Sequence, residues 1–177
     1  MDKRLPLYMA DIVTGEDKML SLSLTKQPAS GQMGKVLSND QDGTKIFFPI
    51  LPANKPIYRK NETYGEHYVL FLPDVIRDIM RDANKRNIPF DLEHQGEPID
   101  GIEWISSFQI DYKNKTFFNN YPNLTDGSWV GIVNLVNPRL RGEFCLQNIF
   151  GISISGIFSY HEIGLSEAIE IYKNFRI

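Results

Sequence analysis

The chain has 177 residues, 42% hydrophobic and 23% charged, which suits a folded globular protein with one domain over residues 1–177. Its formal net charge of −3 argues against a surface that coats nucleic acid, because such surfaces normally carry a strong basic excess. No run approaches the roughly 20 apolar residues of a membrane-spanning helix, so neither nucleic acid nor a membrane is an expected partner.

Cysteine usage and metal-ligand spacing narrow the chemistry. Cys145 is the only cysteine, so no disulfide can form within the chain and a reducing compartment is expected. Its apolar neighbours and the lack of a nearby base predict a buried, inert thiol. No paired-cysteine or His-Glu-x-x-His spacing is present, and the Gly-Lys at residues 34–35 lacks the full phosphate-loop pattern. We therefore expect neither a metal nor a cofactor.

Short strands dominate the first third of the chain. Leu20, Leu22 and Leu24 alternate with serines, which is typical of a strand with one buried face. Residues 26–44 are rich in Gln, Pro, Ser, Gly, Asn and Asp, and they predict a loop that we expect to be mobile. Strands are predicted over residues 7–13, 18–24, 45–51 and 67–71.

One helix stands out, from Pro73 to about Lys85. Proline suits the first helical position, where its missing N–H costs nothing. Apolar residues recur on one face and charged residues on the other, as in an amphipathic surface helix. The Asn-Ile-Pro segment at residues 87–89 ends it.

The rest of the chain returns to strands. A polar loop is expected over residues 113–126, a turn or brief helix over 138–142, and a second helix over 166–174. The predicted class is α+β, with a mostly antiparallel β core. Further strands are predicted over residues 90–94, 102–111, 128–136 and 149–161.

The segment Gly-Ile-Ser-Ile-Ser-Gly at residues 151–156 is the best candidate for a nucleophile. Ser153 and Ser155 share one face of the predicted strand, and the flanking glycines let another backbone or a substrate approach closely. A serine paired with a histidine is the minimum for acyl transfer. Close packing of the sheet explains the same small residues without any chemistry.

Of the three histidines, His94 is the best candidate for the base. It ends a short predicted strand that can neighbour the serine strand, although a lone histidine at a strand end is more often structural. His67 is expected to be a solvated surface residue. His161 shares a strand face with Ser153, but eight residues of straight strand separate them by roughly 26 Å.

A third residue should orient the imidazole and stabilise its positive charge. Glu103 lies between Ile102 and Trp104, in the strand that returns from His94, so it is the candidate for this role. The alternative is that Glu103 only faces solvent, as strand alternation allows. Glu93 is the weaker candidate, because neighbouring strand residues face opposite sides.

Five segments of the chain, in order, carry a resemblance to one known family: residues 48–59, 91–94, 101–105, 126–130 and 151–156. Together they resemble the phage XkdF-like proteases, a family of serine proteases. Residues 48–59 resemble that family's P-x-x-x-P-x-x-P-I-Y-R opening, and residues 151–156 resemble its Gly-Phe-Ser-Ile-Glu-Gly, with Ile152 and Ser155 in place of its aromatic and acidic residues. The resemblance covers about residues 45–160.

The resemblance implies a caudoviral prohead protease, distantly related to herpesvirus assemblins. The implied fold is a herpesvirus-protease-like β-barrel core with a few peripheral helices. Ser153 matches the nucleophile and His94 the general base, while Glu103 is a tentative third member and Ser155 remains an alternative attacking residue. The implied substrates are the phage scaffold and major capsid protein, and the chain itself.

The implied setting is the prohead interior, within the bacterial host cytoplasm, and the assemblin analogy adds a homo-oligomer as a further expectation. A rival interpretation is a structural phage-head protein that keeps the protease fold without activity. A third is a regulatory or docking β-domain with no catalytic history.

Overall fold

The computed structural model describes residues 5–13, 20–28, 34–111, 121, 124–146, 151–156 and 158–174. In this part of the chain the fold is α+β, with mostly antiparallel strands arranged in three sheets and three helices. The three sheets share one hydrophobic core. The described strands form no closed barrel, so the expected class is confirmed without the barrel.

The largest sheet has the order β3-β4-β9-β8 and is antiparallel throughout. Its central strands are rich in apolar and aromatic residues, and most of their side chains are buried, as expected for a sheet covered on both faces. The strands are β3 (Lys35–Asp40), β4 (Gly43–Leu51), β9 (Trp129–Leu135) and β8 (Ile102–Gln109).

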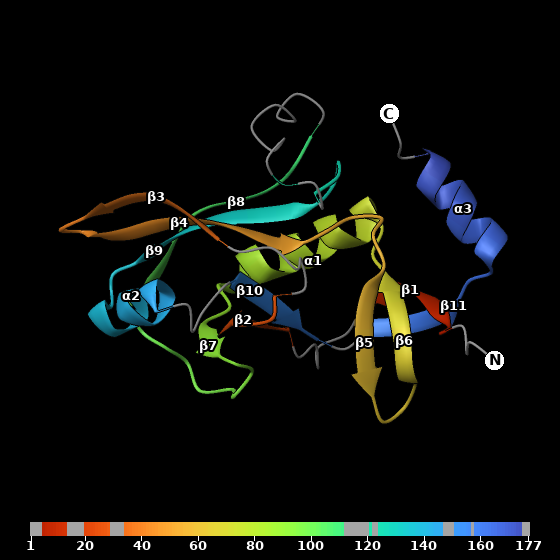
Figure 1. Ribbon diagram of the computed structural model, residues 1–177, viewed down its shortest axis with the longest axis horizontal. Coiled ribbons are helices and arrows are strands. Elements are labelled where there is room, and N and C mark those ends of the chain that lie inside the picture. Colours follow the sequence, from red (N-terminus) through yellow and green to blue (C-terminus); the bar gives the residue numbers. More distant parts are fainter. Residues whose placement is uncertain are drawn as a thin grey trace.

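The second sheet has the order β11-β1-β6-β5 and lies at the other end of the molecule (Figure 1). Strand β1 pairs antiparallel with β11 and parallel with β6, which brings residues near both ends of the chain together. The strands are β11 (Phe158–Glu162), β1 (Leu7–Ile12), β6 (Gly65–Leu70) and β5 (Ile57–Asn61).

A small sheet of order β10-β2-β7 lies between the other two in Figure 1. Strand β2 (Ser21–Thr25) is central, antiparallel to β10 (Gly151–Ser155) and parallel to β7 (Phe90–Leu92). One face of this sheet is apolar and joins the core, while the other carries hydroxyl groups.

Three helices complete the fold. Helix α1 (Pro73–Arg86) begins with the predicted proline, buries Ile76, Ile79 and Ala83, and packs against β1, β8 and β9. Helix α2 (Pro138–Cys145) is capped by Asn137, whose side chain accepts a hydrogen bond from the Arg139 N–H. Helix α3 (Leu165–Asn174) lies beyond the second sheet (Figure 1). None of the described helices is long and apolar enough to cross a membrane.

Two predicted elements need correction. The single strand expected over residues 149–161 is two strands, β10 and β11, which belong to different sheets. The loop expected over residues 26–44 contains strand β3, which pairs with β4, while residues 29–33 lie outside the described part of the chain. Polar residues form a strand there because β4 supplies a complete hydrogen-bonding edge.

Two single-residue predictions are also wrong. Cys145 is exposed, because it lies at the end of helix α2 rather than in a buried strand. His67 is fully buried, because its strand β6 is inside the second sheet and rings of Tyr8, Tyr64 and Tyr160 surround it.

Candidate active site

The small sheet places a row of polar side chains on one face. Ser153 pairs with Ser23, and Ser23 pairs with Asp91, so the three residues lie side by side across strands β10, β2 and β7. Directly paired residues project from the same face of a sheet, with Cβ atoms about 5 Å apart. Ser155 pairs with Ser21 and extends the same polar face.

The opposite face explains why this register is well determined. Alternate residues of the three strands are buried in the hydrophobic core. A slip of one residue would turn these apolar side chains to the polar face and the hydroxyls into the core. The residues concerned are Leu22, Leu24, Phe90, Ile152 and Ile154.

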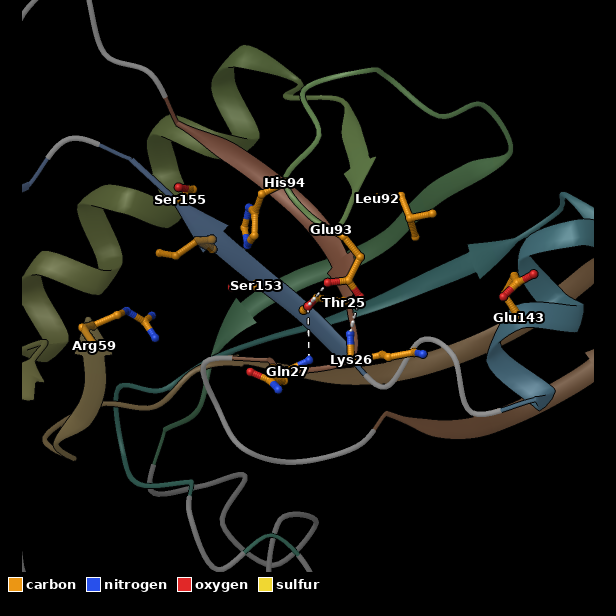
Figure 2. Close-up of a pocket in the computed structure, with 11 residues that line it drawn as sticks. Thr25, Lys26, Gln27, Arg59, Leu92, Glu93, His94, Glu143, Ser153 and Ser155 are labelled. Carbon is orange, nitrogen blue, oxygen red and sulfur yellow. Dashed lines mark hydrogen bonds between the residues drawn. The ribbon is translucent and has the colours of Figure 1, made fainter. Parts of the chain in front are cut away.

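A pocket of about 810 Å³ opens over the polar face. Ser153 and His94, 59 positions apart in the sequence, both line it. Ser153 is largely buried with 7% of its surface exposed, whereas Ser155 at the end of the strand is exposed. Figure 2 shows the His94 ring over the strand that carries both serines. The lining residues are Thr25, Lys26, Gln27, Arg59, Leu92, Glu93, His94, Glu143, Ser153, Ile154 and Ser155.

His94 enters the pocket from an unusual turn. Strand β7 ends at Leu92, and Glu93 and His94 both adopt left-handed backbone conformations, with φ of 51° and 58°. Such conformations are uncommon outside glycine and cluster where the surroundings over-determine them. We had expected strand alternation to turn Glu93 away from His94, but alternation stops at Leu92 and both residues line the same pocket.

Hydrogen bonds to strand β2 hold this turn. The Glu93 carboxylate accepts from the Thr25 hydroxyl at 3.1 Å and from the Lys26 backbone N–H at 2.8 Å. The Glu93 N–H donates to the Leu24 carbonyl oxygen at 2.9 Å. These bonds come from both the backbone and the side chain, so they set the direction in which the chain presents His94.

His94 and Asp91 meet at Ser23. The Ser23 hydroxyl donates to Asp91 Oδ1 and lies 2.8 Å from His94 Nδ1. The second carboxylate oxygen, Asp91 Oδ2, accepts the Gly96 N–H at 2.9 Å. Ser23 is fully buried and Asp91 is 5% exposed, so little water competes for the bond between them, whereas His94 is exposed to the pocket. Among the described residues, no hydrogen bond joins His94 to Ser153.

Charged residues of both signs surround the pocket. Lys26 and Arg59 bring positive charge, and Glu93 and Glu143 negative charge. Burial lowers the pKa of the Arg59 guanidinium, and the neighbouring Tyr160 phenol opposes that shift. The pocket therefore carries side chains of both signs of charge.

The remaining predicted residues lie elsewhere. Glu103 is on β8 in the largest sheet, is exposed, and accepts a hydrogen bond from Asn134 Nδ2 at 3.2 Å. It is not among the residues that line the pocket. His161 pairs with the Asp11 carboxylate at 3.5 Å on the second sheet, and His67 Nδ1 donates to the Gly65 carbonyl oxygen at 2.9 Å.

The structure thus brings together Ser153, Ser155 and His94, and adds Ser23 and Asp91, which were not predicted from the sequence as site residues. A signal for both was present. Ser23 lies on the polar side of an alternating strand, and Asp91 is a carboxylate inside an apolar strand, where it needs a partner.

Comparisons with known proteins add no evidence about the role of this site. No family model, curated protein or solved structure matches this chain. Among the described residues, no group of three or more His, Cys, Asp or Glu side chains is placed to hold a metal ion.

Proposed function

We propose that this chain is a phage prohead maturation protease, a serine endopeptidase that cleaves segments of the scaffold and major capsid protein, and its own chain, inside the assembling head. The observation that carries the proposal is that Ser153 and His94, far apart in the sequence, line one pocket. The substrates and the setting come from the resemblance of five sequence segments to the phage XkdF-like proteases. Kinship with the herpesvirus-protease core is part of the same proposal.

The reaction would proceed by acyl transfer. His94 takes the proton from Ser153 Oγ as that oxygen bonds to the carbonyl carbon of the scissile peptide. The C–N bond then breaks, and His94 passes the proton to the leaving amine. Water adds to the acyl-enzyme with His94 again as base, the ester C–O bond breaks, and the released acid leaves Ser153 and His94 as they began.

Two observations support Ser153 over its neighbours as the attacking residue. It lines the pocket, whereas Ser23 is fully buried and does not. Ser153 also lies in the middle of strand β10, directly beside Ser23, which contacts His94. Ser155 lies at the exposed end of the same strand. Paired residues have Cβ atoms about 5 Å apart, so the imidazole that contacts Ser23 lies next to the strand position of Ser153.

One observation favours the rival function, a structural phage-head protein without activity. The described hydrogen bonds of His94 include Ser23 and do not include Ser153. Hydrogen bonds of a catalytic pair are often long before substrate binds, so the geometry is compatible with both functions.

A covalent probe separates the two. The purified chain is incubated with a fluorophosphonate, which transfers its phosphonyl group to an activated serine oxygen as fluoride leaves, and the labelled residue is mapped by mass spectrometry. We expect the label on Ser153. Ser153→Ala should abolish it, and His94→Ala should slow it by about a hundredfold or more.

Ser155→Ala is the matched control, because it removes a hydroxyl from the same strand face, and it should keep the label. A label on Ser155 would move the nucleophile to that residue. An unlabelled chain with an intact circular dichroism spectrum would favour the structural function. The substrates are tested by mixing the chain with the scaffold and major capsid protein of the same phage, which the wild type should cleave and Ser153→Ala should not.

A further inference from the structure

We infer that Ser23 and Asp91 are positioning residues that set the tautomer of His94, with the Ser23 hydroxyl as a bridge between carboxylate and imidazole. The inference deepens the proposed function and rests on it for its catalytic meaning. The tautomer itself is a property of the resting protein and can be measured without any substrate.

The hydrogen-bond inventory leads to this assignment. A carboxylate only accepts hydrogen bonds, and the two oxygens of Asp91 face the Ser23 hydroxyl and the Gly96 N–H. A serine hydroxyl has a single proton, which here goes to Asp91. Towards His94 the Ser23 oxygen is therefore left as an acceptor only.

His94 must then be the donor in its own bond with Ser23. The contact is made by Nδ1, at 2.8 Å from Ser23 Oγ, so Nδ1 carries the proton of the neutral ring. In a neutral imidazole the other nitrogen is then bare and accepts. The bridge consequently leaves Nε2 free of its proton, and an unprotonated ring nitrogen is what a general base requires.

The same bridge serves the charged state. When Nε2 takes the proton of Ser153, both ring nitrogens bear hydrogen, and Nδ1–H still donates to the Ser23 oxygen. The Asp91 charge lies one hydroxyl away, and the Ser23–Asp91 bond is buried although the His94 ring is exposed to the pocket. Hydrogen bonds joined in a chain strengthen one another. Asp91 thus takes, through Ser23, the orienting role that the sequence had given to Glu103.

The surroundings of Ser23 and Asp91 favour a role for these two residues beyond packing. Ser23 lies between Leu22 and Leu24, both in the core, and it holds a carboxylate inside a sheet. A buried carboxylate is costly unless it is well bonded. The left-handed turn at residues 93–94 is what brings the His94 ring back over Ser23, since a continued strand would carry it away.

The test is the ¹⁵N spectrum of the imidazole groups in the full-length protein, at a pH where His94 is neutral. The expected result is one dominant tautomer with the proton on Nδ1. Ser23→Ala removes the bridge and should shift His94 towards the Nε2–H form, and Asp91→Asn should do the same because Asn can donate to Ser23. Ser23→Thr keeps the hydroxyl and should retain the wild-type tautomer.

Ser21→Ala is the matched control, since Ser21 lies two residues away on the same strand face and pairs with Ser155. It should leave the His94 spectrum unchanged. In the fluorophosphonate assay, Ser23→Ala should lower the labelling rate by about tenfold or more while the label stays on Ser153. Ser23→Thr should restore most of that rate.

A wild-type spectrum with the proton on Nε2 would overturn the inference, even if Ser153 is labelled normally. An unlabelled protein whose His94 tautomer still responds to Ser23→Ala would uphold the bridge and reject the protease. If Ser23→Ala fails to fold, the wild-type and Ser23→Thr spectra still decide, because each tautomer gives its own pattern of nitrogen shifts.

Discussion

The left-handed backbone at Glu93 predicts an unusual order of stability for two substitutions at this position. Alanine normally stabilises a protein relative to glycine, but at Glu93 we expect the reverse, because φ is 51°. Glu93→Ala and Glu93→Gly both lose the side-chain bonds to Thr25 and to the Lys26 N–H. That loss cancels when the two variants are compared, so the difference between their free energies of unfolding reports the backbone conformation alone.

The expected difference follows from two opposing terms. An L-residue in the left-handed region costs roughly 1–2 kcal/mol relative to a right-handed one. Glycine costs about 0.4–1 kcal/mol through the freedom of the unfolded chain. Taking the middle of each range, Glu93→Gly should therefore unfold with a free energy about 0.8 kcal/mol higher than Glu93→Ala. Glu93→Ala should be less stable than the wild type by about 1 kcal/mol, since the bonded carboxylate is lost. Glu93→Gly should lie closer to the wild type, because relief of the left-handed backbone offsets part of that loss.

Urea denaturation followed by circular dichroism measures these differences. Asn84, which is exposed in helix α1, provides the control: there Asn84→Ala should be more stable than Asn84→Gly by about 1 kcal/mol. If Glu93→Ala equals or exceeds Glu93→Gly in stability, the turn does not adopt this backbone in solution and does not hold His94 over Ser23 in the way described.

One pH dependence follows from the structure. Burial raises the pKa of the Tyr160 phenol above its usual value near 10, with the Arg59 charge opposing and Tyr64 adding to the shift. Above pH 10 the unfolded chain therefore releases this proton first, so the free energy of unfolding should fall as pH rises through the folded-state pKa. Tyr160→Phe should show a shallower fall in alkaline urea titrations, and an equal slope would refute the assignment.

Local sequence patterns correctly predicted helix α1 and strand β2, whose formation depends on residues close together in the chain. Helix α1 was predicted from its proline, its apolar face and its Asn-Ile-Pro end, and the structure confirms it. Strand β2 was predicted from the alternation of leucine and serine. In both cases one face of a regular element is buried, so the periodicity of the sequence records the burial.

The missed features depend on contacts between distant segments. Strand β3 is polar, and it forms because β4 offers it an edge. The break after β10 was marked only by Gly156, and a glycine within a strand equally indicates a bulge. The turn at residues 93–94 contains no glycine, so nothing in its sequence predicts left-handed residues.

Some residues of the candidate site could be predicted from local sequence, and others depend on contacts between distant segments. Ser153 and His94 were named from local sequence and from the resemblance, and the structure places both at one pocket. Asp91 could not be joined to them, because its link depends on the pairing of β2 with β7 and of β2 with β10. Glu103 was chosen for its nearness along the chain, and the sheet order puts it on a different sheet from His94's strand.

The energetic costs concentrated around His94 are consistent with the proposal that this corner of the fold is a functional site. Two successive non-glycine residues adopt left-handed conformations, and a carboxylate is buried beside a fully buried serine hydroxyl. Glycine in the turn and apolar residues at Asp91 and Ser23 would make the same sheet at lower cost. Proteins retain such local conflicts mainly at functional sites, where surrounding contacts hold them in place. Here the contacts that hold them all act to place one imidazole beside the strand that carries Ser153.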